Sequence, residues 1–199
     1  MVETRCIETE CHHSVYRTSL RSVPETLLIG DLRLDNRIVI APMCQYSASN
    51  GTPGDWHMIR LGHLALSGAG LMILEATAIS PEDLGLYSYE NENALAKILT
   101  AVRAHSPIAV ALLLSHAGRK ASSRAPWEGG AQIRPDEPLG WKTEAPSPVP
   151  HAEGEDIPLA LDRAGLDRVR NGFVEATRRA ARLGFDGIEI HGAHGYLLH

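Results

Sequence analysis

Two histidines and a tyrosine follow an apolar segment near the end of the chain. Residues 184–190 have the composition of a short buried strand, and His191, His194 and Tyr196 come directly after them. In α/β proteins, the side chains that carry chemistry collect beyond the carboxyl ends of parallel strands. The three residues therefore predict an active site that begins at this strand end.

Metal binding is a second chemistry that the histidine spacing permits. His191 and His194 could form a zinc pair together with Cys44 or Glu189. A protein zinc site needs at least three side-chain ligands, however, and no supporting third ligand stands near the pair in sequence. We therefore predict no metal.

Three other predicted strand ends carry residues that suit a ligand site. They are the runs Ala41-Pro42-Met43-Cys44-Gln45-Tyr46, Glu75-Ala76-Thr77 and Ser115-His116-Ala117-Gly118-Arg119-Lys120. The cations of the last run suit an anionic or electron-rich ligand. We expect all of these strand ends to meet at one rim of a sheet.

The elements that position these residues alternate between strand and helix. Alternating apolar residues from Leu27 onward, with a Gly-Asp turn, predict a β-hairpin. Uniformly apolar runs predict buried parallel strands at residues 38–41, 71–78, 108–115 and 184–190. Apolar residues at helical spacing predict helices at residues 55–66, 91–104 and 162–183, the first of them capped by Asp55.

This order of elements predicts an α/β fold with a parallel sheet and helices outside it. A barrel and an open sheet both fit, but no Gly-x-Gly-x-x-Gly motif follows the first strand, which disfavours a dinucleotide-binding open sheet. We predict a (β/α)8 TIM-barrel type, of which about the first four βα units are present, preceded by the hairpin. Residues 23–199 form this N-terminal half-barrel, with a long rim loop at residues 116–158.

Composition and charge favour a globular protein with a small-molecule substrate. The 199 residues carry a net charge of −5, and no basic face rich in aromatics indicates nucleic acid. The longest apolar runs are too short for a membrane span. The three cysteines do not describe a disulfide framework, so we expect a cytoplasmic location. Residues 1–22 lack a secretory signal and are predicted to be a disordered extension.

Further motifs accompany the strand ends described above. They are Asp35-Asn36-Arg37-Ile38-Val39-Ile40, Asp55-Trp56-His57, Gly68-Ala69-Gly70, Pro126-Trp127-Glu128-Gly129 and His191-Gly192-Ala193-His194-Gly195-Tyr196. Together with the three strand-end runs, these motifs follow one another in order over residues 27–199. On these motifs the chain resembles the Old Yellow Enzyme family of flavin-dependent ene-reductases, in particular its branch of bacterial xenobiotic reductases.

The resemblance implies an FMN-binding barrel that uses NAD(P)H as reductant. Hydride would pass through the flavin to the activated C=C bond of α,β-unsaturated carbonyls. The residues that the resemblance places at the flavin are Ala41, Pro42, Met43, Cys44 and Ala76. Among them, Cys44 would lie near the reactive face of the flavin and tune its redox potential.

The resemblance also implies roles at the substrate. His191 and His194 would hydrogen-bond the substrate carbonyl oxygen and stabilise the charge that develops there. Tyr196 would donate a proton to the α-carbon. Tyr46 and Lys120 would contact the substrate.

Two features depart from the family pattern. Leu113 stands where the family has a glutamine that hydrogen-bonds the pyrimidine edge of the flavin. The family also continues through four further βα units, which supply an arginine beside the flavin and its phosphate site. We therefore expect a truncated half-barrel that associates as a homo-oligomer or with the missing C-terminal half. The alternative is a non-catalytic half-barrel that acts as a binding or assembly fragment without flavin.

Overall fold

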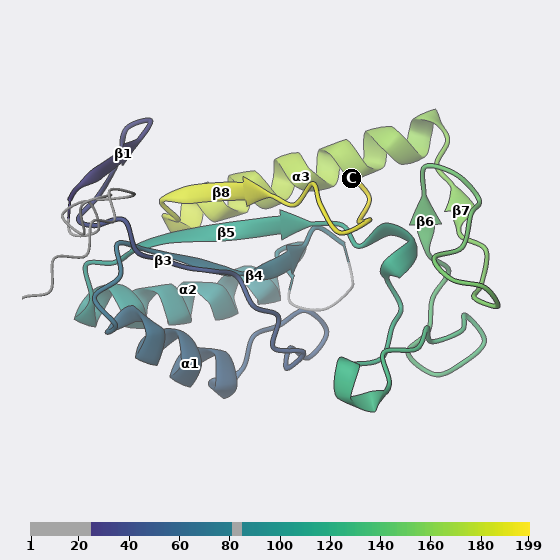
Figure 1. The fold of residues 1–199 in the computed structure, drawn as a ribbon, viewed down its shortest axis with the longest axis horizontal. Helices are drawn as coiled ribbons and strands as arrows, with labels where there is room; N and C mark the ends of the chain where they lie inside the picture. Colours follow the sequence, from purple (N-terminus) through teal and green to yellow (C-terminus); the bar gives the residue numbers. More distant parts are fainter. Residues whose placement is uncertain (1–24, 81–84) are drawn as a thin grey trace, which may run out of the picture.

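A parallel sheet forms the centre of the molecule. The computed structural model describes residues 25–80 and 85–199, so the predicted extension at residues 1–22 lies outside the described residues. The sheet has the order β3-β4-β5-β8 (Figure 1), and its strands are β3 (Val39–Ile40), β4 (Leu71–Ala78), β5 (Ala109–Ser115) and β8 (Gly187–Ile190). Every neighbouring pair is parallel, as the uniformly apolar runs predicted.

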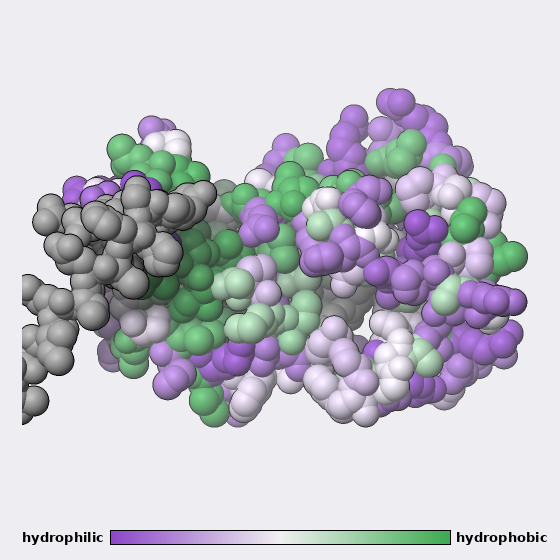
Figure 2. Space-filling model, in the orientation of Figure 1, coloured by the Kyte–Doolittle hydropathy of each residue, from purple (hydrophilic) through white to green (hydrophobic). Residues whose placement is uncertain are grey.

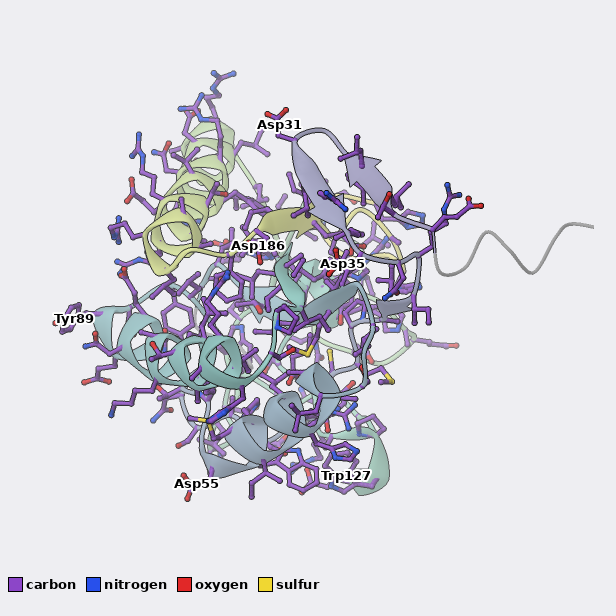
Figure 3. All side chains as sticks on the ribbon, turned by 90° about the vertical axis from the view of Figure 1, so that its left-hand side faces the viewer. Asp31, Asp35, Asp55, Tyr89, Trp127 and Asp186 are labelled. Atoms are coloured by element: carbon purple, nitrogen blue, oxygen red, sulfur yellow. The ribbon has the colours of Figure 1, made fainter. Side chains whose placement is uncertain are left out.

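Three helices connect these strands. α1 (Asp55–Ala65) follows β3, α2 (Tyr89–His105) follows β4, and α3 (Arg163–Leu183) comes between β5 and β8. Seen along the sheet from the hairpin end, they form an arc outside the strands (Figure 3). The described residues therefore contain three complete βα units and the strand of a fourth.

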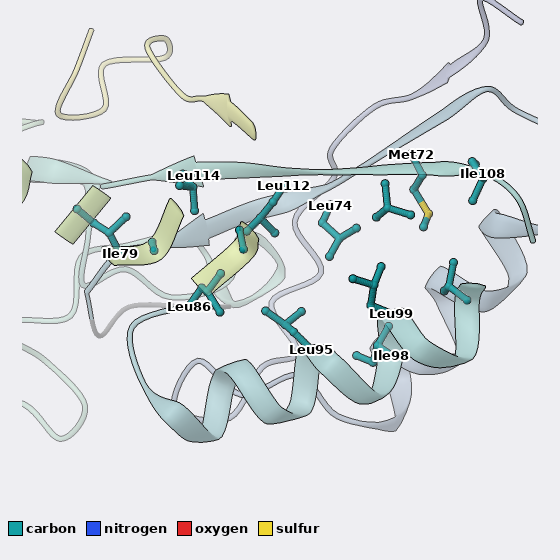
Figure 4. Packing of buried hydrophobic residues seen from close by; sticks show 14 of the residues in the cluster. Met72, Leu74, Ile79, Leu86, Leu95, Ile98, Leu99, Ile108, Leu112 and Leu114 are labelled. Carbon is teal, nitrogen blue, oxygen red and sulfur yellow. The ribbon is translucent and has the colours of Figure 1, made fainter. Parts of the chain in front are cut away.

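The outer face of the sheet packs against the helices (Figure 4). Met72 and Leu74 of β4 and Leu112 of β5 are at most 3% exposed, and they share one cluster with Leu95 and Leu99 of α2. Burial of each such side chain is worth about 1.5–3 kcal/mol. Because parallel strands in this architecture are covered on both faces, most residues of β4 and β5 are apolar and do not alternate with polar ones. The exceptions are Glu75 and Thr77 of β4 and Ser115 of β5.

The hairpin covers the amino-terminal end of the other face. Its strands, β1 (Leu27–Ile29) and β2 (Leu32–Leu34), pair in antiparallel fashion. Leu34 is 1% exposed and packs with Leu71 of β4 and Ala111 of β5. The hairpin thus lies at the end of the sheet opposite the predicted site.

The excursion between β5 and α3 lies beyond the carboxyl ends of the strands (Figure 1). It contains η2 (Gly118–Lys120), η3 (Pro126–Glu128), β6 (Glu144–Ala145) and β7 (Leu159–Ala160). The Ser122 hydroxyl joins its parts, because it donates to the Ile133 carbonyl at 2.8 Å and accepts from the Trp141 N–H at 3.1 Å. In Figure 2 this region is mostly hydrophilic, whereas hydrophobic surface gathers over the hairpin and the sheet.

The first turns of α1 and α3 are capped in different ways. The prediction that Asp55 caps α1 is wrong, since Gly54 is the N-cap and Asp55 is the first helical residue. His57 Nδ1 accepts the Gly54 N–H at 3.2 Å. At α3, Asp162 Oδ1 accepts the Gly165 N–H at 2.7 Å, which is the usual side-chain cap.

Asp162→Ala is expected to lower the free energy of unfolding by about 1 kcal/mol, because a first-turn N–H of α3 loses its acceptor. Urea unfolding followed by circular dichroism measures the change. Asp167→Ala is the control, since Asp167 lies on the same helix in ion pairs with Arg163 and Arg170 at the surface. Such pairs contribute about 0.5 kcal/mol or less. Equal losses in the two variants would contradict the capping role.

Candidate active site

The carboxyl end of β8 carries the predicted histidines and tyrosine as one cluster. The ring centroid of His191 is 5.2 Å from that of His194 and 4.7 Å from that of Tyr196, and both contacts are edge-to-face. The His191 N–H donates to the Leu114 carbonyl of β5 at 2.9 Å. The sheet therefore sets the position of His191, and ring contacts join the other two side chains to it.

Lys120 and Leu197 hold the turn that follows β8. His194 has a φ of +59°, a left-handed conformation that is unfavourable for a residue with a side chain. Lys120 Nζ donates to the His194 carbonyl at 2.6 Å, and the Leu197 N–H donates to the His116 carbonyl at 3.0 Å. Lys120, predicted to contact the substrate, thus bonds the backbone of a neighbouring site residue.

Burial and charge both lower the pKa of His191. Desolvation is the main cause and the nearby His194 adds to it, whereas Glu189 of β8 acts in the opposite direction. The lowered pKa favours the neutral imidazole, in which one ring nitrogen donates a hydrogen bond and the other accepts. Desolvation likewise lowers the pKa of His116, which is buried at the end of β5.

His194→Ala is expected to raise the pKa of His191, because it removes a neighbour whose charge opposes protonation. Glu189→Gln is the matched variant and is expected to lower the same pKa. An NMR pH titration of the imidazole C–H signals measures both, and shifts in the same direction would contradict this assignment.

The same lowered pKa affects stability. Below the ordinary histidine pKa of about 6.5, the unfolded chain binds the His191 proton more readily than the native state does. The contribution of His191 to stability is therefore present above that pH and is lost as the pH falls below it.

Cys44 and Tyr46 lie after β3, at the opposite edge of the sheet from β8. Tyr46 has a φ of +50°, and its ring meets Trp127 of η3 edge-on, with centroids 5.5 Å apart. Between the two site residues, the Gln45 N–H donates to the Glu75 carboxylate at 2.6 Å. Trp127 and Glu75 have no role in the predicted site, although both occur in the motifs that carry the family resemblance.

The remaining residues predicted at the flavin lie along the sheet and just beyond β3. Ala76 of β4 pairs with Leu113 of β5, which pairs with Glu189 of β8, so the three lie side by side across the sheet. Residues 41–44 are exposed or half-buried. The apolar Ala76 suits the flat face of a flavin ring. Leu113, at 5% exposure, offers no hydrogen bond to the polar edge of the ring.

The side chains at the carboxyl end of β8 are hydrogen-bonding groups. Within residues 25–80 and 85–199, no three His, Cys, Asp or Glu side chains come close enough to hold a metal ion. Two imidazoles and a phenol supply hydrogen bonds and an exchangeable proton there.

In the same residue ranges, no helix combines the length and the apolar character that a membrane crossing requires.

Residues 25–199 match the NADH:flavin oxidoreductase / NADH oxidase family. The chain belongs to this family. A NADH:flavin oxidoreductase of Gibberella zeae is 40% identical over 182 residues, which are 87% of this chain and 44% of the relative. A NADPH dehydrogenase of Geobacillus thermodenitrificans is 36% identical over 175 residues, 84% of this chain and 46% of the relative. Family members use FMN with NAD(P)H as reductant, as predicted.

Solved structures of the family have the same fold. Morphinone reductase is similar with a TM-score of 0.73 and 29% identity, over 88% of this chain and 49% of that one. The old yellow enzyme from Trypanosoma cruzi is similar with a TM-score of 0.72 and 28% identity, over 89% and 52%. The predicted family and the partial barrel are thereby confirmed. The chain spans about half the length of the curated relatives it matches.

Proposed function

We propose that this chain forms part of an FMN-dependent NAD(P)H oxidoreductase of the ene-reductase type, which reduces the activated C=C bond of α,β-unsaturated carbonyls. The main observation in support is the contact of His191 with His194 and Tyr196 at one strand end. When bound, FMN supplies the hydride chemistry. Family membership supports the oxidoreductase class.

The protein side chains then have three tasks. His191, whose lowered pKa favours the neutral imidazole, donates a hydrogen bond to the substrate carbonyl oxygen together with His194. Tyr196 holds at its phenolic oxygen the proton destined for the α-carbon. Tyr46 contacts the substrate from the opposite sheet edge, and Lys120 keeps the His194 turn in place.

The cofactor would rest on the rim of the sheet. Its contacts are proposed to be Ala41, Pro42, Met43, Cys44, Ala76 and Leu113. Leu113 contributes apolar contact alone, so the polar edge of the ring lacks one hydrogen bond.

The two edge strands of the sheet are placed to pair with the strands of further βα units. β3 and β8 are edge strands in the described residues, and Val39 and Ile190 on them are 43% and 61% exposed. Unpaired edges of this kind favour pairing with another strand. We propose that a second half-barrel, from another copy or from a C-terminal half, completes the site in the cytoplasm.

The visible spectrum of the purified chain with added FMN tests the proposal. A bound-flavin band near about 450 nm that bleaches with NADPH and returns with an α,β-unsaturated ketone under nitrogen is expected. The measurement is made on the chain alone and with a relative's C-terminal half added. Failure to bind FMN in both arrangements would contradict the proposed function.

A second candidate is a half-barrel that binds or assembles without flavin. The observation in its favour is that Leu113, where the family resemblance implies a flavin-binding glutamine, is an apolar side chain with 5% exposure. A colourless protein that still forms a defined dimer in size-exclusion chromatography with light scattering would support it.

A further inference from the structure

We infer that Glu75, paired with His57, is a positioning residue that holds the segment 44–46 in place at the rim of the sheet. The inference rests on the proposed function in one respect, because that function assigns Cys44 and Tyr46 to the flavin and the substrate. Neither Glu75 nor His57 touches a proposed ligand in that scheme. Both act through the backbone of the segment.

Glu75 and His57 form a buried pair between β4 and α1. The two residues are 7% and 2% exposed, and His57 Nε2 lies 3.5 Å from Glu75 Oε1. A carboxylate is unfavourable in such a place unless hydrogen bonds and an opposite partner compensate for the lost hydration. The second carboxylate oxygen of Glu75 makes such a hydrogen bond.

Glu75 Oε2 accepts the Gln45 N–H at 2.6 Å. That N–H belongs to the peptide group that joins Cys44 to Gln45, so the carboxylate holds the backbone directly beside the Cys44 side chain. The next residue, Tyr46, has the unfavourable φ of +50°. Hydrogen bonds to an ionised acceptor are stronger than neutral ones, which suits this bond to hold a strained segment.

His57 is oriented toward the carboxylate by the start of α1. Its Nδ1 accepts the Gly54 N–H at 3.2 Å, so the ring hydrogen is on Nε2. Nε2 is buried and has no hydrogen-bond partner in the described residues, and Glu75 Oε1 lies 3.5 Å from it. The first turn of α1 thus places the His57 ring against the carboxylate that bonds the segment 44–46.

The Gln45 side chain provides a second restraint that can be separated from the first. Trp56 Nε1 donates to Gln45 Oε1 at 3.2 Å, and Gln45 Nε2 donates to the Met43 carbonyl at 2.7 Å. Gln45→Ala removes both contacts but keeps the backbone N–H that bonds Glu75. This substitution is the matched control.

The test measures how fast iodoacetamide alkylates Cys44 in the full chain. Cys6 and Cys11 are first replaced by Ser, so that Cys44 is the one remaining thiol. Loss of an acceptor from a buried donor shifts local equilibria by about tenfold or more, so Glu75→Ala is expected to speed alkylation of the half-buried Cys44 about 10-fold. Glu75→Gln keeps an acceptor oxygen and, like Gln45→Ala, is expected to stay within about 3-fold of the parent.

Two results would overturn the inference. In one, Glu75→Gln speeds alkylation as much as Glu75→Ala, which would assign the effect to charge and not to the bond. In the other, Glu75→Ala leaves the rate unchanged or Gln45→Ala reproduces its effect. Circular dichroism shows whether each variant is folded, so that a general loss of structure is recognised.

Amide hydrogen exchange provides a measurement that needs no variant. The Gln45 amide of the parent is expected to be protected, and the Ser47 amide serves as the local comparison. A Gln45 amide that exchanges as fast as that of Ser47 would overturn the inference even if Glu75→Ala does not fold. Neither measurement requires flavin. Failure to bind FMN would therefore contradict the proposed function and leave the inference about Glu75 unaffected.

Discussion

Tyr196→Phe is expected to lower the rate at which the FMN-loaded, NADPH-reduced protein converts an α,β-unsaturated ketone by about 10²–10⁴-fold, the usual contribution of a general acid. The substitution removes the phenolic proton and keeps the ring that packs against His191 with centroids 4.7 Å apart. The cluster is therefore expected to keep its geometry. Stopped-flow absorbance under anaerobic conditions measures the rate.

Two controls accompany this variant. The rate of reduction by NADPH should not change, because that half-reaction needs no proton from Tyr196. Tyr89→Phe, on α2 with Tyr89 72% exposed, should leave both rates unchanged. A parental rate of ketone conversion in Tyr196→Phe would mean that another group supplies the proton.

Leu113→Gln is expected to tighten FMN binding by about 5- to 150-fold, which corresponds to about 1–3 kcal/mol for satisfying one buried polar group. The position suits the change, since Leu113 lies beside Ala76 on β4 and Glu189 on β8 in the strand register. Titration of FMN fluorescence measures the dissociation constant.

Without flavin, Leu113→Gln is expected to destabilise the folded protein. Leu113 is 5% exposed, so an amide introduced there is buried without a partner and should lower the unfolding free energy by about 1–3 kcal/mol. Leu113→Met changes volume little and adds no polar group, and it should alter neither property appreciably. Weaker or unchanged FMN binding in Leu113→Gln would show that the polar edge of the ring does not lie at this position.

The topology could be predicted because its signals are local. The runs that became β4 and β5 are mostly apolar, as is usual for parallel strands covered on both faces. The helix boundaries were less predictable, and Asp55 was assigned to the wrong cap position. Gly54 takes that position, and the side chain of His57 at the third helical position accepts its N–H. A glycine N-cap bonded by a histidine side chain has no common sequence signature.

Motif order was likewise enough to assign the family and to predict His191, His194 and Tyr196 as one group. These residues stand within six positions of one another directly after a strand, so chain connectivity alone keeps them close. Leu113 could also be recognised from the sequence as a departure from the family pattern, because an apolar residue stands where the family has a glutamine.

The partners of the charged side chains required the folded structure. Lys120 bonds the His194 carbonyl and Glu75 bonds the Gln45 N–H, across 74 and 30 positions of sequence. Neither bond has a pattern in the chain, because each depends on which strand ends the sheet brings together and on how the backbone turns at His194 and Tyr46. Residue types and local spacing thus specify which chemical groups are available. Long-range packing determines which backbone group each charged side chain hydrogen-bonds.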